Sequence, residues 1–180
     1  MRKMILGFGL IIFLTIFPIA CGMEEEFCRD MARDYLVNKT VTSLHCQQNG
    51  KKVKIDNPDE VLPLFTALQI SQGGCSIWAN ENVWRNDTFI PYGGSIDEDD
   101  DFSLEIRNPE NVSIPMNFEI GGKKVKCLFN GGIQWEGEAK SDDHLTGEIY
   151  YDLKKRHNAR KSCPDACSIN MTFDADKAPQ

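Results

Sequence analysis

Apolar and polar residues alternate with a period of two over most of the C-terminal half of the chain. The alternating stretches are 114–120, 125–129, 133–139, 145–153 and 167–173. Successive side chains of a β-strand point to opposite faces, so this pattern predicts antiparallel strands with one buried and one solvated face. Short turn sequences at 121–122, 130–132 and 141–143 separate most of the stretches, which predicts a meander.

Two glycines in these stretches favour a curved sheet. Gly137 and Gly147 lie in neighbouring stretches, each at a position on the apolar side of its stretch. A turn centred on Asp142 places them opposite each other. Paired inward glycines allow a sharp bend, as at a barrel corner. The predicted fold is one all-β, mainly antiparallel domain of about eight strands, either a single curled barrel or a two-sheet sandwich. Its core should contain Phe118, Phe129, Trp135, Ile149 and Phe173.

The N-terminal half is less regular. Phe27, Met31 and Tyr35 are spaced four residues apart, which predicts a short amphipathic helix over 24–37. Strands are expected on both sides of the turn at 48–50, and the segment around Trp78 reads as irregular. The further strands expected in this half are 65–70, 88–91 and 102–107.

The first twenty residues have the features of an export signal. Arg2 and Lys3 give a basic start, residues 5–19 carry no charge, and small residues surround Cys21. The sequence at 18–22 resembles the lipobox of bacterial lipoproteins. The resemblance implies a signal peptide at 1–20, a single extracytoplasmic β domain at 21–180, and attachment to the membrane of the cell envelope through an acylated Cys21.

Two alternatives for the leader remain open. Cleavage after Gly22 would release a secreted protein, because Ala20 and Gly22 are small residues at the positions that a signal peptidase reads. A retained membrane anchor is the other alternative, although the apolar stretch is shorter than the ~20 residues that a spanning helix needs.

The other six cysteines are predicted to form three disulfides, because an even number in an exported chain is typical of a disulfide framework. Cys127 and Cys167 both lie on the apolar side of their alternating stretches, so they should point to the same side of the sheet and are expected to pair. The remaining expected pairs are Cys46 with Cys75 and Cys28 with Cys163. A zinc site made by Cys163, Cys167 and His157 is the alternative, but its spacing matches no common zinc motif.

Charge restricts the class of partner. Without Arg2 and Lys3 the chain has 20 − 2 = 18 basic residues against 27 acidic residues, a formal charge of −9. Such a surface provides no electrostatic footprint for nucleic acid, and it is repelled by anionic lipid headgroups.

The sequence predicts no enzyme and no cofactor. No nucleophile motif, zinc-protease motif or phosphate-binding loop is present. Glu136 and Glu148 could act as paired carboxylates, but both are expected to face solvent. Asp97, Asp99 and Asp101 are a weak calcium candidate, since the loop lacks the spacing and the final glutamate of a calcium loop.

The predicted role is structural or partner-binding. Trp78 and Trp84 are the candidate contact residues, whereas Trp135 is expected in the core. One alternative is a lipocalin-like barrel that carries a small apolar ligand in a cavity lined by Phe118, Phe129, Ile149 and Met171. Another is a secreted eukaryotic glycoprotein, since glycosylation sequons begin at Asn38, Asn86, Asn111 and Asn170.

Overall fold

The computed structural model describes residues 28–83 and 88–179, and these residues form an almost entirely β structure. One short 3-10 helix, η1 (Pro58–Glu60), accompanies the strands, and the described residues contain no α-helix. The strands are β1 (Asp34–Gln48), β2 (Lys51–Val53), β3 (Phe65–Gly73), β4 (Ser76–Val83), β5 (Thr88–Ile96), β6 (Asp101–Ile106), β7 (Ile114–Ile120), β8 (Lys123–Ser141), β9 (His144–Lys155) and β10 (Ala166–Lys177).

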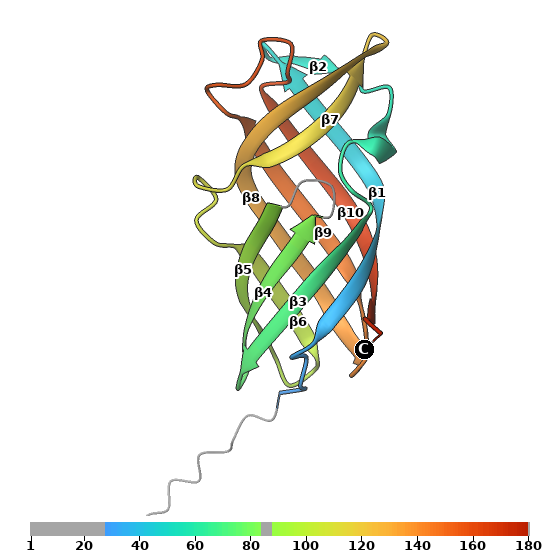
Figure 1. The fold of residues 1–180 in the computed structure, drawn as a ribbon, viewed down its shortest axis with the longest axis vertical. Helices are drawn as coiled ribbons and strands as arrows, with labels where there is room; N and C mark the ends of the chain where they lie inside the picture. Colours follow the sequence, from blue (N-terminus) through green and yellow to red (C-terminus); the bar gives the residue numbers. More distant parts are fainter. Residues whose placement is uncertain (1–27, 84–87, 180) are drawn as a thin grey trace, which may run out of the picture.

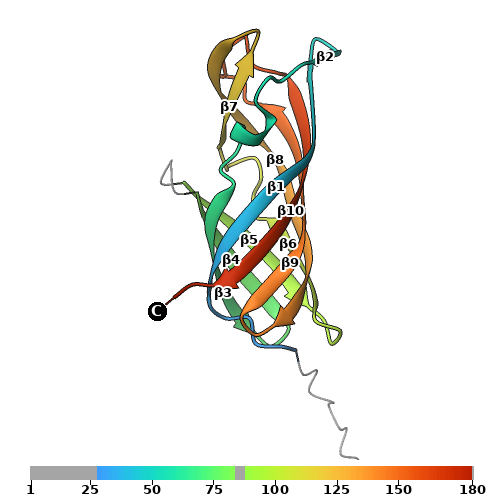
Figure 2. The same cartoon turned by 90° about the vertical axis from the view of Figure 1, so that its right-hand side faces the viewer.

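The strands form a closed antiparallel barrel (Figures 1 and 2). Around the barrel the order is β1, β3, β4, β5, β6, β8, β9 and β10, and β10 pairs with β1 to close the ring. Chain order and spatial order therefore agree, as in an up-and-down meander. The predicted all-β fold is confirmed, and of its two forms the structure has the barrel.

The upper part of the barrel in Figure 1 is built differently from the lower part. Strands β3 to β6 occupy only the lower part, while β7 extends the wall above by pairing with the first half of β8. The segment 54–64 links β2 to β3 and closes the remaining gap. The backbone N–H of Asn117 donates to Val61 O at 3.1 Å, and that of Lys39 donates to Leu64 O at 2.7 Å.

The turn expected at 130–132 does not form, because β8 continues through it as a single strand. Gly131 has φ +148°, and a Cβ built on it would lie 2.1 Å from the carbonyl oxygen of Asp152. Only glycine fits such a bend. On one side, β8 pairs with β7 before this bend and with β6 after it. On the other side it pairs with β9 across the bend.

The paired glycines lie where the sequence predicts them. Gly137 of β8 is directly opposite Gly147 of β9. A Cβ on Gly147 would lie 2.1 Å from Glu136 O and 2.8 Å from the ring of Phe173. The absence of both side chains therefore lets the two strands curve tightly around the aromatic rings of the core.

The expected N-terminal helix is wrong over its described part. Asp34 begins β1, because Tyr35 and Val37 point inward while Leu36 points outward, which is a strand pattern. Residues 28–33 cross the lower mouth of the barrel, where Met31 is 1% exposed and Arg29 lies 2.5 Å from Asp100. Residues 24–27 lie outside the described part of the chain.

The three disulfides join Cys28 to Cys75, Cys46 to Cys167 and Cys127 to Cys163, so all three expected pairings are wrong. Cys46 and Cys167 are 121 residues apart in sequence but directly opposite on β1 and β10. The alternation along a strand predicts which face a cysteine lies on, but not which distant strands become neighbours when the barrel closes.

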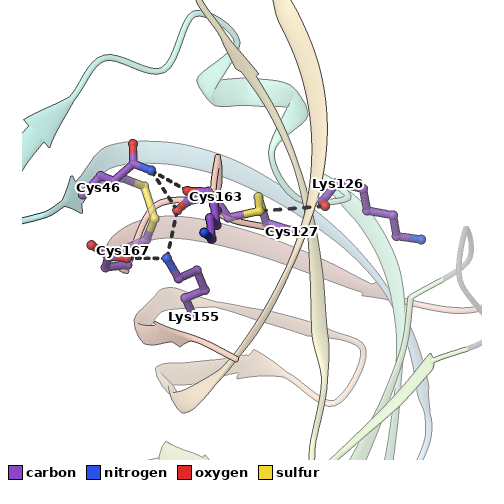
Figure 3. Close-up of a disulfide and its surroundings, with 9 residues drawn as sticks. Cys46, Lys126, Cys127, Lys155, Cys163 and Cys167 are labelled. Carbon is purple, nitrogen blue, oxygen red and sulfur yellow. Dashed lines mark hydrogen bonds and ion pairs between the residues drawn. A yellow bond between two sulfur atoms is a disulfide. The ribbon is translucent and has the colours of Figure 1, made fainter. Parts of the chain in front are cut away.

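Figure 3 shows Cys163 beside the Cys46–Cys167 bridge. The carbonyl of Cys163 accepts a hydrogen bond from Lys155 Nζ at 3.4 Å. The bridges indicate a non-reducing, extracytoplasmic environment.

Two neighbouring residues of β8, Trp135 and Glu136, provide a test of which side chains form the core. Trp135 is fully buried against Phe173, with ring centroids 5.0 Å apart, whereas Glu136 points to solvent. We expect Trp135→Ala to lower the free energy of unfolding by ~3–5 kcal/mol and Glu136→Ala to change it by less than ~0.5 kcal/mol. Urea denaturation followed by circular dichroism measures both. Equal midpoints for the two variants would contradict the inward facing of Trp135.

Candidate functional site

Charged and polar side chains meet inside the barrel, in a group that we call the interior cluster: Lys39, Thr66, Glu81, Tyr92, Trp135 and Tyr151. They come from six strands, and each occupies the inward parity of its strand. The segment around Trp78, expected to be irregular, is strand β4, and it carries Glu81 inward at a position where a strand normally has an apolar residue.

A buried ion pair is the centre of the interior cluster. Lys39 is 3% exposed and Glu81 is 1% exposed, and the Lys39 ammonium contacts Glu81 Oε1. The Tyr92 hydroxyl donates to Glu81 Oε2 at 2.8 Å. Lys39 Nζ also lies 5.0 Å from the ring centroid of Trp135, a cation–π distance. Both oxygens of the carboxylate are therefore occupied by donors.

Two polar atoms of the interior cluster have no hydrogen-bond partner among the described residues. They are Thr66 Oγ1 and Trp135 Nε1, and both residues are buried. Most buried polar groups in proteins are paired, because an unpaired one has lost its water without replacement. The interior cluster thus contains two of the three buried side-chain polar atoms that have no partner within the described part of the chain.

Burial shifts the pKa of both tyrosines in the interior cluster. It raises the pKa of Tyr92 well above 10, and the nearby Glu81 charge raises that pKa further. The pKa of Tyr151 is raised well above 10 by the same two causes in the same order. Both hydroxyls therefore remain protonated, and Tyr92 remains a donor to Glu81.

The outer surface of β3, β4 and β5 carries no charged side chain at the described outward positions; with Leu36 of the adjoining β1 we call it the neutral face. It holds the exposed large apolar residues of the described chain: Leu36, Phe65, Trp78 and Phe89 at 46%, 69%, 45% and 62% exposure. Leu36, Ala67, Asn82 and Phe89 form one row across four strands. Scattered exposed apolar residues are common, but a group confined to one face is typical of an interaction site.

The opposite outer surface, on β6, β8, β9 and β10, is acidic and we call it the acidic face. Its outward carboxylates are those of Asp101, Glu105, Glu136, Glu138, Glu148, Asp152, Asp174 and Asp176. Glu136 lies directly opposite Glu148, and Asp101 directly opposite Glu138. Like charges opposite each other destabilise a sheet. An open hollow of about 560 Å³ lies among Asp97, Asp101, Glu136 and Glu138.

His144 is the described histidine with carboxylates around it. Its Nδ1 lies 2.8 Å from Asp176 Oδ1 and its Nε2 lies 3.5 Å from Asp174 Oδ2. The two ring nitrogens face different carboxylates. One nitrogen of His144 and one oxygen of each carboxylate also lie within 4.8 Å of one another, close enough for the three side chains to hold a metal ion.

The calcium candidate forms a turn. Asp97 Oδ1 accepts the backbone N–H groups of Asp99 and Asp101, each at 3.0 Å. This carboxylate therefore holds the β5–β6 connection in place. Asp99 is exposed, and neighbouring Asp100 has a lowered pKa because Arg29 hydrogen-bonds to it. A calcium role for Asp97, Asp99 and Asp101 stays a prediction.

The other predicted site residues divide into described and undescribed ones. Trp78 is exposed on the neutral face, and Trp135 lies in the core, as predicted. Cys21 and Trp84 lie outside the described residues. The sequon residues Asn38, Asn111 and Asn170 are all exposed, whereas Asn86 lies outside the described chain.

Lys39 and Glu81 are the functional candidates that sequence reasoning missed. Tyr35 and Val37 precede Lys39 on the inward parity of β1, and Ile77 and Ala79 precede Glu81 on that of β4. The signal in the sequence is that Lys39 and Glu81, with opposite charges, each stand where the alternation of their strand calls for an apolar residue. Lys39 is also the middle residue of the sequon that begins at Asn38.

Comparison with known proteins gives no assignment, since neither a protein-family model nor a curated protein matches this chain. Within residues 28–83 and 88–179, no helix has the length and apolar character needed to cross a membrane.

Raised tyrosine pKa values predict a destabilisation in alkali. Burial raises the pKa of Tyr35 to about 12, against 10 when exposed, and Tyr92 and Tyr151 are raised as well. The folded state therefore holds protons that the unfolded state releases, so stability is full below pH ~10 and is lost as pH rises through the folded values. Tyrosinate absorbance should rise near pH 10 in denatured protein, and the part contributed by Tyr35, Tyr92 and Tyr151 should rise only at higher pH in folded protein. Coincident titration curves would contradict the burial of these hydroxyls.

Proposed function

We propose that the protein is a lipid-anchored, extracytoplasmic binding module that recognises a partner protein through its neutral face. The observation that carries the proposal is the concentration of exposed aromatic and aliphatic side chains on strands whose own outward positions carry no charge. The cores of protein interfaces are rich in aromatic residues and poor in charges. Trp78, Phe65 and Phe89 are the proposed anchor residues for the partner.

Packing of the interior favours a surface function over transport of a ligand. Phe118, Phe129, Ile149 and Met171, which would line a carrier cavity, are each at most 1% exposed and belong to one continuous core. The rings of Phe118 and Phe129 contact each other edge to face at 5.9 Å. A small barrel can either hold a ligand or fill with side chains, and these side chains occupy the space themselves.

Anchoring through Cys21 fits the geometry of the barrel. Cys28 is seven residue steps from Cys21 (28 − 21 = 7), a reach of at most ~25 Å. Cys28 lies at the lower end of the barrel, where the disulfide to Cys75 holds it beside the β3–β4 turn. An acyl group on Cys21 would therefore keep the barrel close to the membrane while its sides stay accessible to a partner.

Lipid attachment is tested by replacing the proposed acylated residue. We expect a fatty-acid analogue fed to the native host to label the wild-type protein and not Cys21→Ser, because only a thiol at this position accepts the acyl chain. Washed membranes should retain the first protein and release the second. Equal release of both proteins would contradict the anchor, and a heavier product bearing hexose would support the glycoprotein alternative.

Partner binding is tested with a photoreactive amino acid on each face. Benzoylphenylalanine in place of Phe89 should give a discrete cross-linked product in intact cells, because this side chain would be buried against the partner. The matched control replaces Tyr150, another outward aromatic residue, which lies on the acidic face. Cross-linking that is absent at Phe89, or equal at the two positions, would contradict the proposal.

A further inference from the structure

We propose that Lys39 and Glu81 become joined by an isopeptide bond, an amide between the lysine Nζ and the glutamate Cδ, formed by the folded barrel itself. This inference rests on the interior cluster and is independent of the neutral face. Four observations carry it: the burial of both groups, their contact, the donor on the second carboxylate oxygen, and the aromatic wall beside the amine.

The position of the pair distinguishes it from the other ion pairs of the described chain. Lys39–Glu81 is the ion pair there with both side chains almost fully buried, at 2% and 1% exposure. The pair Lys140–Glu138, in similar contact on the acidic face, is 49% and 44% exposed. Water stabilises separate charges at the exposed pair, whereas burial removes that stabilisation at the interior one.

The reaction needs no external reagent. The ammonium and the carboxylate first exchange one proton along their hydrogen bond, giving an amine and a carboxylic acid. The lysine Nζ then attacks Glu81 Cδ, a C–N bond forms, and one C–O bond breaks. The second proton lost by nitrogen joins the departing oxygen, which leaves as water. Atoms and charge balance, since –NH3⁺ and –COO⁻ give –NH–CO– and H2O, and nothing is oxidised or reduced.

The barrel supplies the conditions that favour this condensation. Rigid neighbouring groups react as if at very high concentration, with effective molarities of ~10⁵–10⁸ M in well-oriented cases. Tyr92 donates to Glu81 Oε2 at 2.8 Å, which polarises the carboxyl group and offers a donor to the charge that develops on oxygen. Its raised pKa keeps this hydroxyl protonated. The buried site also keeps out the water that would hydrolyse the product.

An amide at this position would reinforce the barrel wall. Lys39 lies on β1 and Glu81 on β4, with β3 between them, so the bond would bridge two strands that are not paired with each other. It would replace two buried charges by one neutral group. Unlike the three disulfides, it would survive reduction, so the fold would remain cross-linked if the redox conditions of the envelope changed.

Mass spectrometry of the full mature chain provides the test, and it requires no variant. After reduction and denaturation, we expect the mass to be about 18 Da below that of the unlinked chain, the mass of one water. Trypsin should fail to cleave after Lys39, and fragmentation should place the missing water in a branched peptide that contains both Lys39 and Glu81.

Variants identify the reacting groups. Lys39→Met and Glu81→Leu should each abolish the loss of water, while Tyr92→Phe should leave a mixture that converts more slowly. The exposed Lys140–Glu138 pair is the internal control and should stay unlinked. The unlinked mass in the wild type would show an ion pair only and overturn the proposal, as would a missing water located at any other residues.

Discussion

Pairing of β1 with β10 is the constraint on which the rest of the structure depends. The two strands are paired from Tyr35 opposite Lys177 to Gln47 opposite Ala166, with one register shift between Val41 and Ser43. They lie near opposite ends of the described chain. Bringing these ends together costs loop-closure entropy before any contact compensates for it. Once they pair, no strand of the lower ring has a free edge, so the barrel avoids the edge-to-edge association that open sheets risk. The bridge between Cys46 and Cys167 fixes this closure covalently.

Closure also explains why an ion pair can be enclosed at all. Lys39 and Glu81 approach each other only when β1, β3 and β4 curve around a common interior. The cost of burying the two charges is offset by their mutual contact, by the Tyr92 hydroxyl and by the Trp135 ring. Replacing such a pair with apolar residues is often neutral or stabilising in other proteins. The geometry of the pair is the basis for the covalent linkage proposed above.

Local patterns in the sequence predict the strands well, and long-range relations poorly. The alternation from Ile114 to Phe173 predicts the inward residues of the C-terminal strands, although it divides β8 in two, and the spacing of Gly137 and Gly147 predicts the register of β8 and β9. These features depend on side-chain parity and short turns. The disulfide pairs depend on which distant strands become neighbours, which parity does not encode. The pattern does not predict strand β4 or the Lys39–Glu81 pair, because Glu81 places a charge where the alternation requires an apolar residue.

The two faces of the outer surface follow from different demands on the same fold. Strands β3 to β5 present aromatic and uncharged polar residues, whereas β6, β8, β9 and β10 accumulate carboxylates, including directly opposed pairs such as Glu136 and Glu148. Neither arrangement stabilises the fold. Opposed like charges weaken a sheet, and exposed aromatic residues gain no stabilisation from burial. Both become intelligible if the acidic face keeps the molecule soluble and repels anionic lipid headgroups. On the function proposed above, the neutral face is the surface that a partner approaches without desolvating charges at its outward positions.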